Sequence, residues 1–353
     1  MEGARPIVSL VVPSRTYVMA GDDASAVDGE RLAGLFEGLE SLGFEVVRTP
    51  GPWRSWKRFG GTDAERLAEF QAALEDPDVD LVLPVRGGYG MARLLPGLDW
   101  KAIAKRRPLA MGFSDFTAFS LALYAKTGLA SWQGPMAGGL APGHTTPALM
   151  KSFLSALSSS SWSAEWARPE GERGAARAEG VLWGGNLSMI VSLLATPFFP
   201  KEKQVKGGIL YLEDVGEAAY RVDRMLLQLW QSGVLESQKA VVFGCFTGAD
   251  RHAAAKGDFM LGDVIADFSK RLRDKGVLVA AGLPFGHIDE LMAIPFGVPG
   301  SLELAEDGSA RLAAAEVPSI ERGREALLAK LEDLRAGRFP SGEPEAGAEG
   351  THP

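Results

Sequence analysis

Residues 79–90 read Val-Asp-Leu-Val-Leu-Pro-Val-Arg-Gly-Gly-Tyr-Gly, a short apolar run that ends in a glycine-rich loop. The run Val79–Val85 has the length and composition of a buried strand. An amphipathic segment precedes it, and Thr62 and Glu65 have the spacing of a capping box at the start of a helix. A helix that leads into a buried strand, with a turn beyond it, is typical of α/β folds.

The same alternation extends in both directions along the first half of the chain. We expect further strands and helices there at Ile7–Val12, Asp28–Leu42, Phe44–Val47 and Leu109–Gly112, from Phe116 onward, and at Leu129–Ser131. Buried strands that alternate with helices predict a parallel sheet with helices on both faces.

The segment Leu157–Gly180 interrupts this pattern. It is rich in Ser, Ala, Gly and charged residues and shows little apolar periodicity, so we expect a crossover between two domains. A second series of elements is expected beyond it, at Asn186–Leu194, Gly208–Leu212, Ala218–Gln231, Ala240–Phe243, Gly262–Lys275, Val277–Ala280, Ser301–Leu304, Ala310–Ala314 and Ile320–Ala336. The predicted division is a domain at 1–157, a linker at 158–180, a domain at 181–337 and a disordered tail at 338–353.

Composition limits the classes of function. The 353 residues include 37 Lys and Arg against 45 Asp and Glu, a formal net charge of −8, which argues against binding to a nucleic-acid backbone. The single cysteine, Cys245, excludes an internal disulfide and a cysteine-based zinc cluster. The first apolar run is too short for a signal peptide, and no stretch approaches the ~20 apolar residues of a membrane helix. We therefore expect a cytoplasmic protein that does not associate with membranes.

Among the four histidines, His287 is the best candidate for chemistry. It lies in a Gly- and Pro-containing loop just after an expected buried strand, which is where open α/β folds place active groups. His352 lies in the tail, His252 in a charged stretch, and His144 in a loop after Pro-Gly. A structural loop histidine is the alternative for His287.

Ser114 is the candidate nucleophile. In Met111-Gly-Phe-Ser-Asp-Phe-Thr a strand ends, a glycine permits a sharp turn, and a helix follows the serine at once. This order resembles a nucleophile elbow, although the second glycine of G-x-S-x-G is absent. The alternative is an ordinary helix-capping serine.

The loop Arg86-Gly-Gly-Tyr-Gly lacks the G-K-[ST] of a phosphate-binding loop and does not match G-x-G-x-x-G. Its adjacent glycines let the backbone approach a ligand and present N–H groups to an anion, so an oxyanion or a carboxylate is the expected partner. A tight turn between strand and helix is the alternative.

Several carboxylates gather after the strand Gly208–Leu212. Glu217 and Arg221 have helical i, i+4 spacing and are expected to pair, whereas Glu213, at the strand end, is placed to orient a histidine. No histidine lies at ligand spacing from Glu213 and Asp214, so no metal site is expected.

Cys245 follows a strand and a glycine, and it offers a rival interpretation. It could be the thiolate nucleophile of a domain like a glutamine amidotransferase. An inert buried cysteine is the alternative.

Considered together, these segments resemble the LD-carboxypeptidase (muramoyltetrapeptide carboxypeptidase) family. The resemblance covers roughly residues 7–300, and its motifs occur in the family's order. They are Phe59-Gly-Gly-Thr-Asp-Ala-Glu-Arg-Leu, Asp76-Pro-Asp-Val-Asp, Arg86-Gly-Gly-Tyr-Gly, Gly112-Phe-Ser-Asp-Phe-Thr, Gly134-Pro-Met, Gly184-Gly-Asn-Leu, Leu212-Glu-Asp-Val-Gly-Glu, Tyr220-Arg-Val-Asp-Arg and Pro284-Phe-Gly-His. Two positions depart from the family pattern: Phe113 stands where a tyrosine is usual, and Ala195-Thr-Pro where a glycine is common.

The resemblance implies a Rossmann-like N-terminal domain with a parallel sheet and a smaller, β-rich α/β C-terminal domain. It implies a Ser-His-Glu triad of Ser114, His287 and Glu213, split between the two domains, and no cofactor. The backbone N–H groups of Asp115 and Gly88 are then expected to bind the oxyanion.

The resemblance also implies the substrate. Family members remove the terminal D-alanine of murein tetrapeptides in the cytoplasm, and a carboxypeptidase must hold a free carboxylate, for which Arg86, Gly87 and Tyr89 are the candidates. A branch of the family instead hydrolyses peptide-nucleotide antibiotics of the microcin type and confers immunity. A catalytically silent ligand-binding module on the same fold is the alternative from a different class. Many relatives are dimers, so a homodimer is expected.

Overall fold

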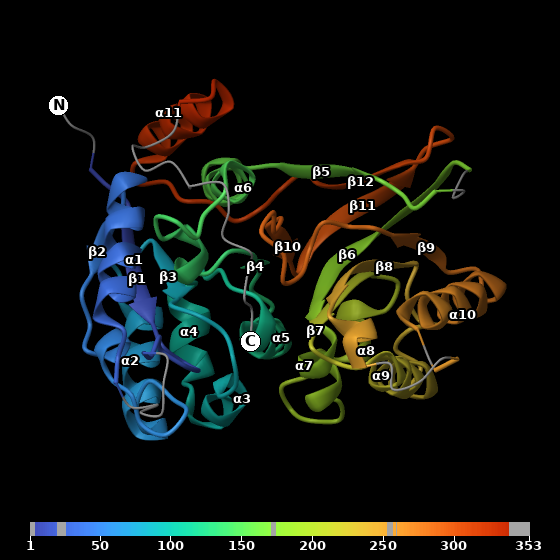
Figure 1. The fold of residues 1–353 in the computed structure, drawn as a ribbon, viewed down its shortest axis with the longest axis horizontal. Coiled ribbons are helices and arrows are strands. Elements are labelled where there is room, and N and C mark those ends of the chain that lie inside the picture. The colour runs from blue at the N-terminus through green and yellow to red at the C-terminus, as the bar shows by residue number, and fades with distance from the viewer. Residues whose placement is uncertain (1–3, 20–25, 171–173, 253–256, 259, 339–353) are drawn as a thin grey trace.

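The computed structural model describes residues 4–19, 26–170, 174–252, 257–258 and 260–338. Two lobes lie side by side in Figure 1, with the N-terminal half of the chain on the left and a large sheet on the right. The expected α/β class is confirmed: one lobe contains a parallel sheet, and the other a curled seven-stranded sheet.

The parallel sheet of the first lobe has the strand order β2-β1-β3, formed by β1 (Ile7–Val11), β2 (Glu45–Val47) and β3 (Leu81–Pro84). Parallel bridges from Val82 to Ala110 and from Met111 to Trp132 extend it to β4 (Ser131–Gln133). The helices of this lobe are α1 (Gly29–Ser41), α2 (Asp63–Glu75), α3 (Met91–Leu94), α4 (Trp100–Arg106), α5 (Thr117–Thr127) and α6 (Pro147–Ser158).

Local sequence signals set the beginnings of the first helices. The capping box predicted for α2 is present, since the Thr62 side chain accepts from the N–H of Glu65 and the Glu65 side chain accepts from the N–H of Thr62. Asp28 caps α1 by accepting from the N–H of Arg31. The apolar faces of both helices lie against the sheet, where Leu35 and Phe70 are fully buried.

The second lobe is built on a seven-stranded sheet of order β5-β12-β11-β6-β7-β8-β9. The four strands β6 to β9 are parallel to one another, and β5, β12 and β11 continue the sheet through antiparallel pairs. The strands are β5 (Trp162–Ala167), β6 (Ala176–Asn186), β7 (Ile209–Val215), β8 (Ala240–Thr247), β9 (Leu278–Ala281), β11 (Val298–Leu304) and β12 (Ser309–Ala314). The helices are α7 (Leu187–Ser192), α8 (Glu202–Val205), α9 (Ala219–Gln231) and α10 (Leu261–Asp274).

The expectation that residues 157–180 lack regular apolar periodicity was wrong. Strand β5 lies in this segment, and its buried residues, among them Trp162 and Trp166, alternate with exposed ones. The first half of β6 follows within the same segment. Every second residue of β5 is exposed, and these exposed residues are small or charged. The strand is therefore buried on one face only, and the composition of the segment alone does not reveal it.

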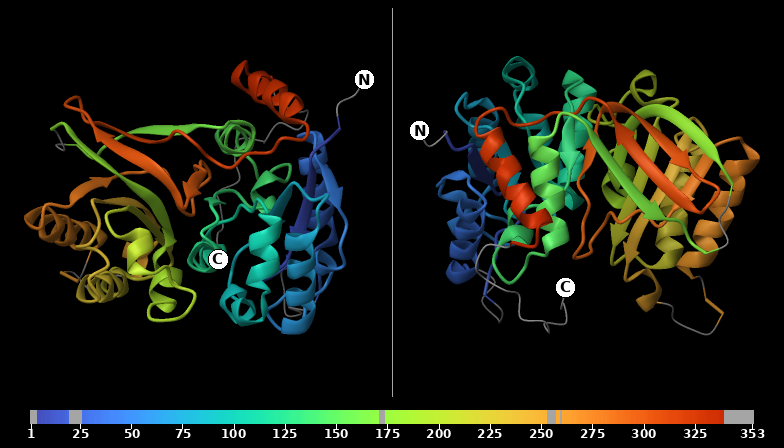
Figure 2. Two further views of the ribbon diagram at one scale, coloured as in Figure 1. Left: turned by 180° about the vertical axis from the view of Figure 1, so that it is seen from behind. Right: turned by 90° about the horizontal axis from the view of Figure 1, so that it is seen from above.

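Among the contacts that join the lobes, two come from segments late in the chain. Strand β10 (Ile294–Phe296), from the second half of the chain, pairs antiparallel with β4 of the first lobe. The last helix, α11 (Arg324–Arg335), returns to the first lobe and packs against α6 (Figures 1 and 2). In the part of the chain that the structure describes, no helix combines the length and the apolar character needed to cross a membrane.

Candidate active site

Ser114 lies at a sharp turn between the parallel sheet and α5. Its φ is +60°, a left-handed conformation that a residue with a side chain adopts only at a cost of about 1–3 kcal/mol. The short 3-10 helix Ser114–Phe116 follows, and α5 is capped by Phe116 rather than by the serine. The Ser114 side chain is therefore not a helix cap, and the strained turn aims it at the second lobe.

His287 and Glu213 approach Ser114 from the second lobe. Glu213, near the carboxyl end of β7, is fully buried, and its Oε2 lies 2.8 Å from His287 Nδ1. His287 Nε2 lies 3.1 Å from Ser114 Oγ. The structure thus brings together the three side chains that the sequence singled out, in a hydrogen-bonded series of serine, histidine and carboxylate. With Nδ1 facing the carboxylate, the neutral imidazole carries its proton on Nδ1 and leaves Nε2 free to accept.

Asn186 and Asp214 complete the surroundings of Glu213. The Asn186 Nδ2 donates to Glu213 Oε1 and to Asp214 Oδ1, each at 3.1 Å. Asp214 also accepts hydrogen bonds from Ser188 and from the N–H of Val215. Burial, followed by the adjacent charge of Glu213, raises the pKa of Asp214 to about 6, against the opposing effect of these hydrogen bonds.

The glycine-rich loop passes directly beside the serine. A Cβ at Gly87 would lie 3.1 Å from Ser114 Oγ, a tight contact that would push the hydroxyl by a few tenths of an ångström. Gly88 has a φ of +127°, which favours glycine. Among the residues that the structure describes, no backbone carbonyl accepts a hydrogen bond from the N–H of Gly87 or Gly88. These two N–H groups are therefore available to an anion beside the serine.

Arg86, at the start of this loop, belongs to a small cationic cluster. Its guanidinium lies 4.9 Å from the centre of the Tyr17 ring, and that of Arg31 lies 3.9 Å from the same ring. Burial lowers the pKa of Arg86 from its usual value, with Arg15 and Arg31 acting in the same direction. An arginine remains charged even so. The cluster is suited to an anionic group of a ligand.

Tyr89, the aromatic residue among the candidates for carboxylate binding, is exposed. Its ring packs on Phe59 at 5.9 Å between centroids, on the outer side of the loop. The structure therefore offers Tyr89 a packing role as well as a surface for a ligand.

The side chain of Asp115, the residue after the serine, holds the turn in place. Its buried carboxylate accepts hydrogen bonds from the Ser14 hydroxyl and from the N–H of Met91. Burial raises the pKa of Asp115 above its usual value, although both hydrogen bonds oppose the change. The side chain ties the elbow to the start of α3, directly after the glycine-rich loop, while its backbone N–H stays next to Ser114.

The remaining candidates lie away from this arrangement. Glu217 pairs with Arg221 at 3.6 Å, as predicted. Cys245 is half-buried with its Sγ 3.8 Å from the carbonyl of Leu283, and burial raises the pKa of its thiol, which disfavours a thiolate. His144 is exposed in its loop. The side chain of His252 and all of His352 lie outside the described residues.

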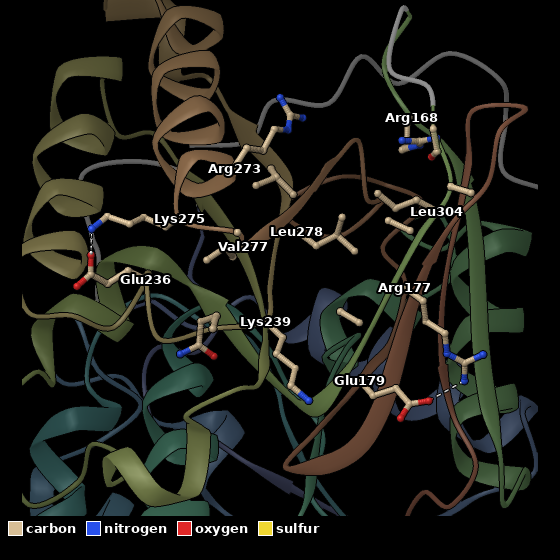
Figure 3. A pocket seen from close by; sticks show the side chains of 17 residues that line it. Arg168, Arg177, Glu179, Glu236, Lys239, Arg273, Lys275, Val277, Leu278 and Leu304 are labelled. Carbon is tan, nitrogen blue, oxygen red and sulfur yellow. Dashed lines mark hydrogen bonds and ion pairs between the residues drawn. The ribbon is translucent and has the colours of Figure 1, made fainter.

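A separate hollow of about 1110 Å³ lies at the opposite end of the second lobe, where β8 and β9 begin (Figure 3). Lys239, Lys275 and Arg177 line it, and two of these pair with acids, Lys275 with Glu236 and Arg177 with Glu179. It contains none of the three aligned side chains. Within the described part of the chain, no group of three or more His, Cys, Asp or Glu residues is placed to hold a metal ion.

Sequence reasoning missed three residues that shape the site. The Phe113 ring packs on the His287 imidazole at 4.8 Å between centroids. Asn186 holds Glu213, and Thr117 holds Asn186 through its hydroxyl, which accepts from the Asn186 N–H at 3.1 Å. All three lie in motifs that were visible in the sequence, but only contacts between the lobes reveal what they do.

Comparisons with known proteins find relatives for both halves of the chain. Residues 18–134 match the LD-carboxypeptidase N-terminal domain and residues 179–302 the LD-carboxypeptidase C-terminal domain. The murein tetrapeptide carboxypeptidase of Pseudomonas aeruginosa is 32% identical over 79% of this chain and 91% of its own length. The Escherichia coli microcin C7 self-immunity protein MccF is 26% identical over 75% of this chain and 83% of its own length.

Among solved structures, the muramoyltetrapeptide carboxypeptidase of Oxalobacter formigenes superposes with a TM-score of 0.76 at 32% identity, covering 89% of this chain and all of the other. Both halves of the chain, its fold and its sequence therefore lead to one conclusion. The chain belongs to the LD-carboxypeptidase family of serine-type carboxypeptidases.

Proposed function

We propose that this protein hydrolyses the amide bond to the C-terminal D-alanine of murein tetrapeptides, by a Ser114-His287-Glu213 triad. The observation that carries the proposal is the series of contacts from Ser114 Oγ to His287 at 3.1 Å and from His287 to Glu213 at 2.8 Å. A buried carboxylate, an imidazole and a serine in this order are the parts of a nucleophilic acyl-transfer site.

In the proposed reaction His287 Nε2 takes the Ser114 proton while Oγ attacks the scissile carbonyl carbon. Glu213 accepts the Nδ1–H, which holds the ring in the required tautomer and stabilises the imidazolium. His287 then gives the proton to the amine of the departing D-alanine, which leaves the remaining peptide on Ser114 as an ester. A water molecule, activated by the same imidazole, hydrolyses that ester.

The negative charge on the carbonyl oxygen requires donors beside Ser114. We assign these to the backbone N–H groups of Asp115 and Gly88, with Gly87 next to them. Support comes from the closeness of Gly87 to Ser114 Oγ and from the lack of a described backbone carbonyl that engages the Gly87 or Gly88 N–H. The loss of one such donor typically costs about 2.7–4 kcal/mol of transition-state stabilisation.

A carboxypeptidase must also recognise the free carboxylate of the terminal residue. We assign this role to Arg86, with Arg31 beside it, because both guanidinium groups lie against the Tyr17 ring next to the glycine-rich loop. An arginine can bind a carboxylate through two parallel hydrogen bonds, which gives both affinity and orientation.

The substrate class rests on similarity. The relatives named for murein tetrapeptides are 32% identical, and removal of D-alanine from such peptides fits a role in the recycling of cell-wall material. The similarity to MccF supports a second candidate, the hydrolysis of a peptide-nucleotide antibiotic of the microcin type.

One experiment separates the two candidates. The purified protein is incubated with a murein tetrapeptide ending in D-alanine, with its L-alanine diastereomer and with an aminoacyl-nucleotide conjugate, and the products are identified by mass spectrometry. We expect release of D-alanine from the first substrate alone. Cleavage of the conjugate with the tetrapeptide left intact would replace the murein proposal by the immunity function, and cleavage of the L-diastereomer would contradict the specificity for a D-residue.

A further inference from the structure

The contact between the lobes from Ser114 to His287 has a buried polar counterpart three residues further along the first lobe. The N–H of Asn186, at the end of β6 in the second lobe, donates to the hydroxyl of Thr117, at the start of α5 in the first lobe, at 3.1 Å. Thr117 and Asn186 are both buried. Two of the polar contacts between the lobes therefore lie close together in the first lobe's sequence, one at Ser114 and one three residues after it.

These two contacts close a ring. From Ser114 the hydrogen bonds run to His287, then to Glu213, to Asn186 and to Thr117. The three-residue step of backbone from Thr117 to Ser114 completes it. A ring of this kind restrains every distance within it, so the Ser114–His287 contact depends on the position of Asn186 as well as on the turn.

The polar side chains around Thr117 are also hydrogen-bonded to one another. The Thr117 hydroxyl donates to Gln133 Oε1 at 3.0 Å, which leaves a lone pair facing the Asn186 N–H. Gln133 is itself fixed, since its Nε2 donates to the Ser120 hydroxyl at 2.8 Å. Buried polar groups satisfied in this way are rigid, because any displacement leaves one of them without a partner.

The backbone is shaped to permit the contact. Gly185 has a φ of +127°, and a Cβ there would lie 2.6 Å from Thr117 Oγ1 and 2.9 Å from Gln133 Oε1. Only a glycine therefore lets the end of β6 approach the first lobe so closely. The Gly184-Gly-Asn segment combines the glycine that allows the approach with the asparagine that uses it.

The Asn186 side chain also bridges two neighbouring carboxylates, those of Glu213 and Asp214. Its Nδ2 donates to both Glu213 and Asp214, while its Oδ1 accepts from the N–H of Met189 and fixes the amide orientation. Glu213 thus keeps Oε1 for Asn186 and directs Oε2 to His287. Without this donor the carboxylate could rotate away from the imidazole.

We propose that Asn186 and Thr117 are positioning residues of the triad: Asn186 fixes the Glu213 carboxylate, and Thr117 ties Asn186 to the segment that carries Ser114. The inference rests on the proposed function of the three triad residues. Neither residue touches the reacting atoms, so both act through Glu213 and through the alignment of the lobes.

The test replaces Thr117 by valine, which has nearly the same shape but no hydroxyl. The matched control is Thr127→Val on the same helix, where the hydroxyl makes only local hydrogen bonds, to the Leu123 carbonyl and from the Leu129 N–H. Two activities are measured: release of D-alanine from the tetrapeptide, and the rate at which a fluorophosphonate labels Ser114. The second needs no peptide substrate.

We expect Thr117→Val to lower kcat about 10-fold with little change in KM, and to slow labelling by a similar factor, the size of one buried hydrogen bond. Thr117→Ser keeps the hydroxyl and should restore both rates to within about threefold of the original. Asn186→Ala should lower kcat further, by about 10- to 100-fold, as is typical when the partner of an active group is removed. Thr62→Ala, which removes the cap of α2 instead, controls for the loss of a helix cap.

The proposal is overturned if Thr117→Val behaves like Thr127→Val in both measurements, or if Thr117→Ser is as impaired as Thr117→Val. Thermal melting of each variant shows whether it is folded, and the valine variant keeps the test decisive if Asn186→Ala does not fold. If the unaltered protein is labelled at Ser114 but releases no D-alanine, the proposed substrate is wrong, and the labelling rates still decide the positioning roles.

Discussion

Glu213 and Glu217 lie four residues apart and differ both in burial and in the residues that they contact. Glu213 is fully buried and contacts His287 and Asn186, whereas Glu217 is partly exposed and pairs with Arg221. Glu213→Gln should lower kcat by about 10⁴-fold, because an amide can favour the wrong imidazole tautomer. Glu217→Gln should remove a pair worth about 0.2–0.5 kcal/mol and leave kcat unchanged. Steady-state kinetics on the tetrapeptide, with thermal melting as a folding control, measures both, and the opposite ranking would show that the wrong carboxylate has been assigned.

Asp214 gives the stability of the protein a specific dependence on pH. Its pKa of about 6 in the folded state lies above the ordinary 3.8, so between these values the folded protein holds a proton that the unfolded chain releases. The contribution of Asp214 to the free energy of unfolding therefore falls as pH rises, by about 2 kcal/mol from pH 4 to pH 7. Asp214→Asn cannot ionise and lacks this change.

The measurement is urea unfolding of both proteins at several pH values. The advantage of the original protein over Asp214→Asn should be greatest near pH 4 and should shrink as the pH approaches 7. A difference in free energy that is constant with pH would contradict a raised pKa at this position.

Among individual residues, the sequence predicted well those side chains whose chemistry few residue types can supply. His287, Ser114 and Glu213 were singled out by residue type and by their place after strands, and the structure brings them within hydrogen-bonding distance. Their catalytic roles remain a prediction. Thr117 and Asn186 could not be found in this way, because a buried threonine and a helix-capping asparagine are common and only the pairing of two distant segments gives them a role.

Among the elements, the loop between β3 and α3 depends most on a single residue type. A Cβ at Gly87 would lie 3.1 Å from Ser114 Oγ and 3.2 Å from Ser114 Cβ, so Gly87→Ala should displace the nucleophile. The serine must shift by a few tenths of an ångström, less than the misplacement of about 1 Å that can cost about 100-fold in rate, so we expect kcat to fall by about 3- to 10-fold with an unchanged Tm.

Gly34→Ala is the matched control for this substitution. Gly34 lies within α1, where a new Cβ meets Pro142 Cδ at 3.9 Å and Ala141 Cβ at 4.0 Å, both ordinary contacts, so the change should stabilise the helix by about 0.5–1 kcal/mol without affecting rate. A fully active Gly87→Ala enzyme would show that the loop does not confine the serine.

Elements with continuous apolar runs or clear helical periodicity were predicted well, among them β1, β3, α2 and α9. Strand β5 was missed because its outward residues are polar, although the alternation of Trp162, Ala164 and Trp166 was present in the sequence. Helix α6 was missed as well, and β10 is only three residues long and is defined by its pairing with β4. Such a short strand has no signal of its own, because its partner lies about 160 residues away in the chain.

The chain leaves the first lobe, forms the second lobe and then returns to the first, and this return helps to hold the molecule together. Helix α11 follows the last strand of the second lobe and packs against α6 (Figure 2). Leu331 on this helix is almost completely buried. Leu331→Ala should destabilise the protein by about 2–5 kcal/mol through lost burial and the cavity left behind. Leu328 lies on the same helix but is exposed, so Leu328→Ala should change Tm little. Equal Tm losses for the two variants would contradict the packing of α11 against α6.

The three aligned side chains come from both lobes, so their arrangement depends on how the lobes are placed. Ser114 belongs to the first lobe, and Glu213 and His287 belong to the second. The sequence suggested such a split, but the alignment of the lobes depends on β10 pairing with β4 and on the contact of Asn186 with Thr117. These are contacts between residues that no local pattern connects.

The most direct test of the central claim is the kcat for D-alanine release by Ser114→Ala, measured beside Cys245→Ala with thermal melting as a folding control. If Ser114 is the nucleophile, its replacement should lower kcat by at least about 10⁴-fold without loss of folding, while Cys245→Ala should keep most of the activity. An active Ser114→Ala enzyme together with an inactive Cys245→Ala enzyme would contradict the serine mechanism and assign the reaction to the thiol.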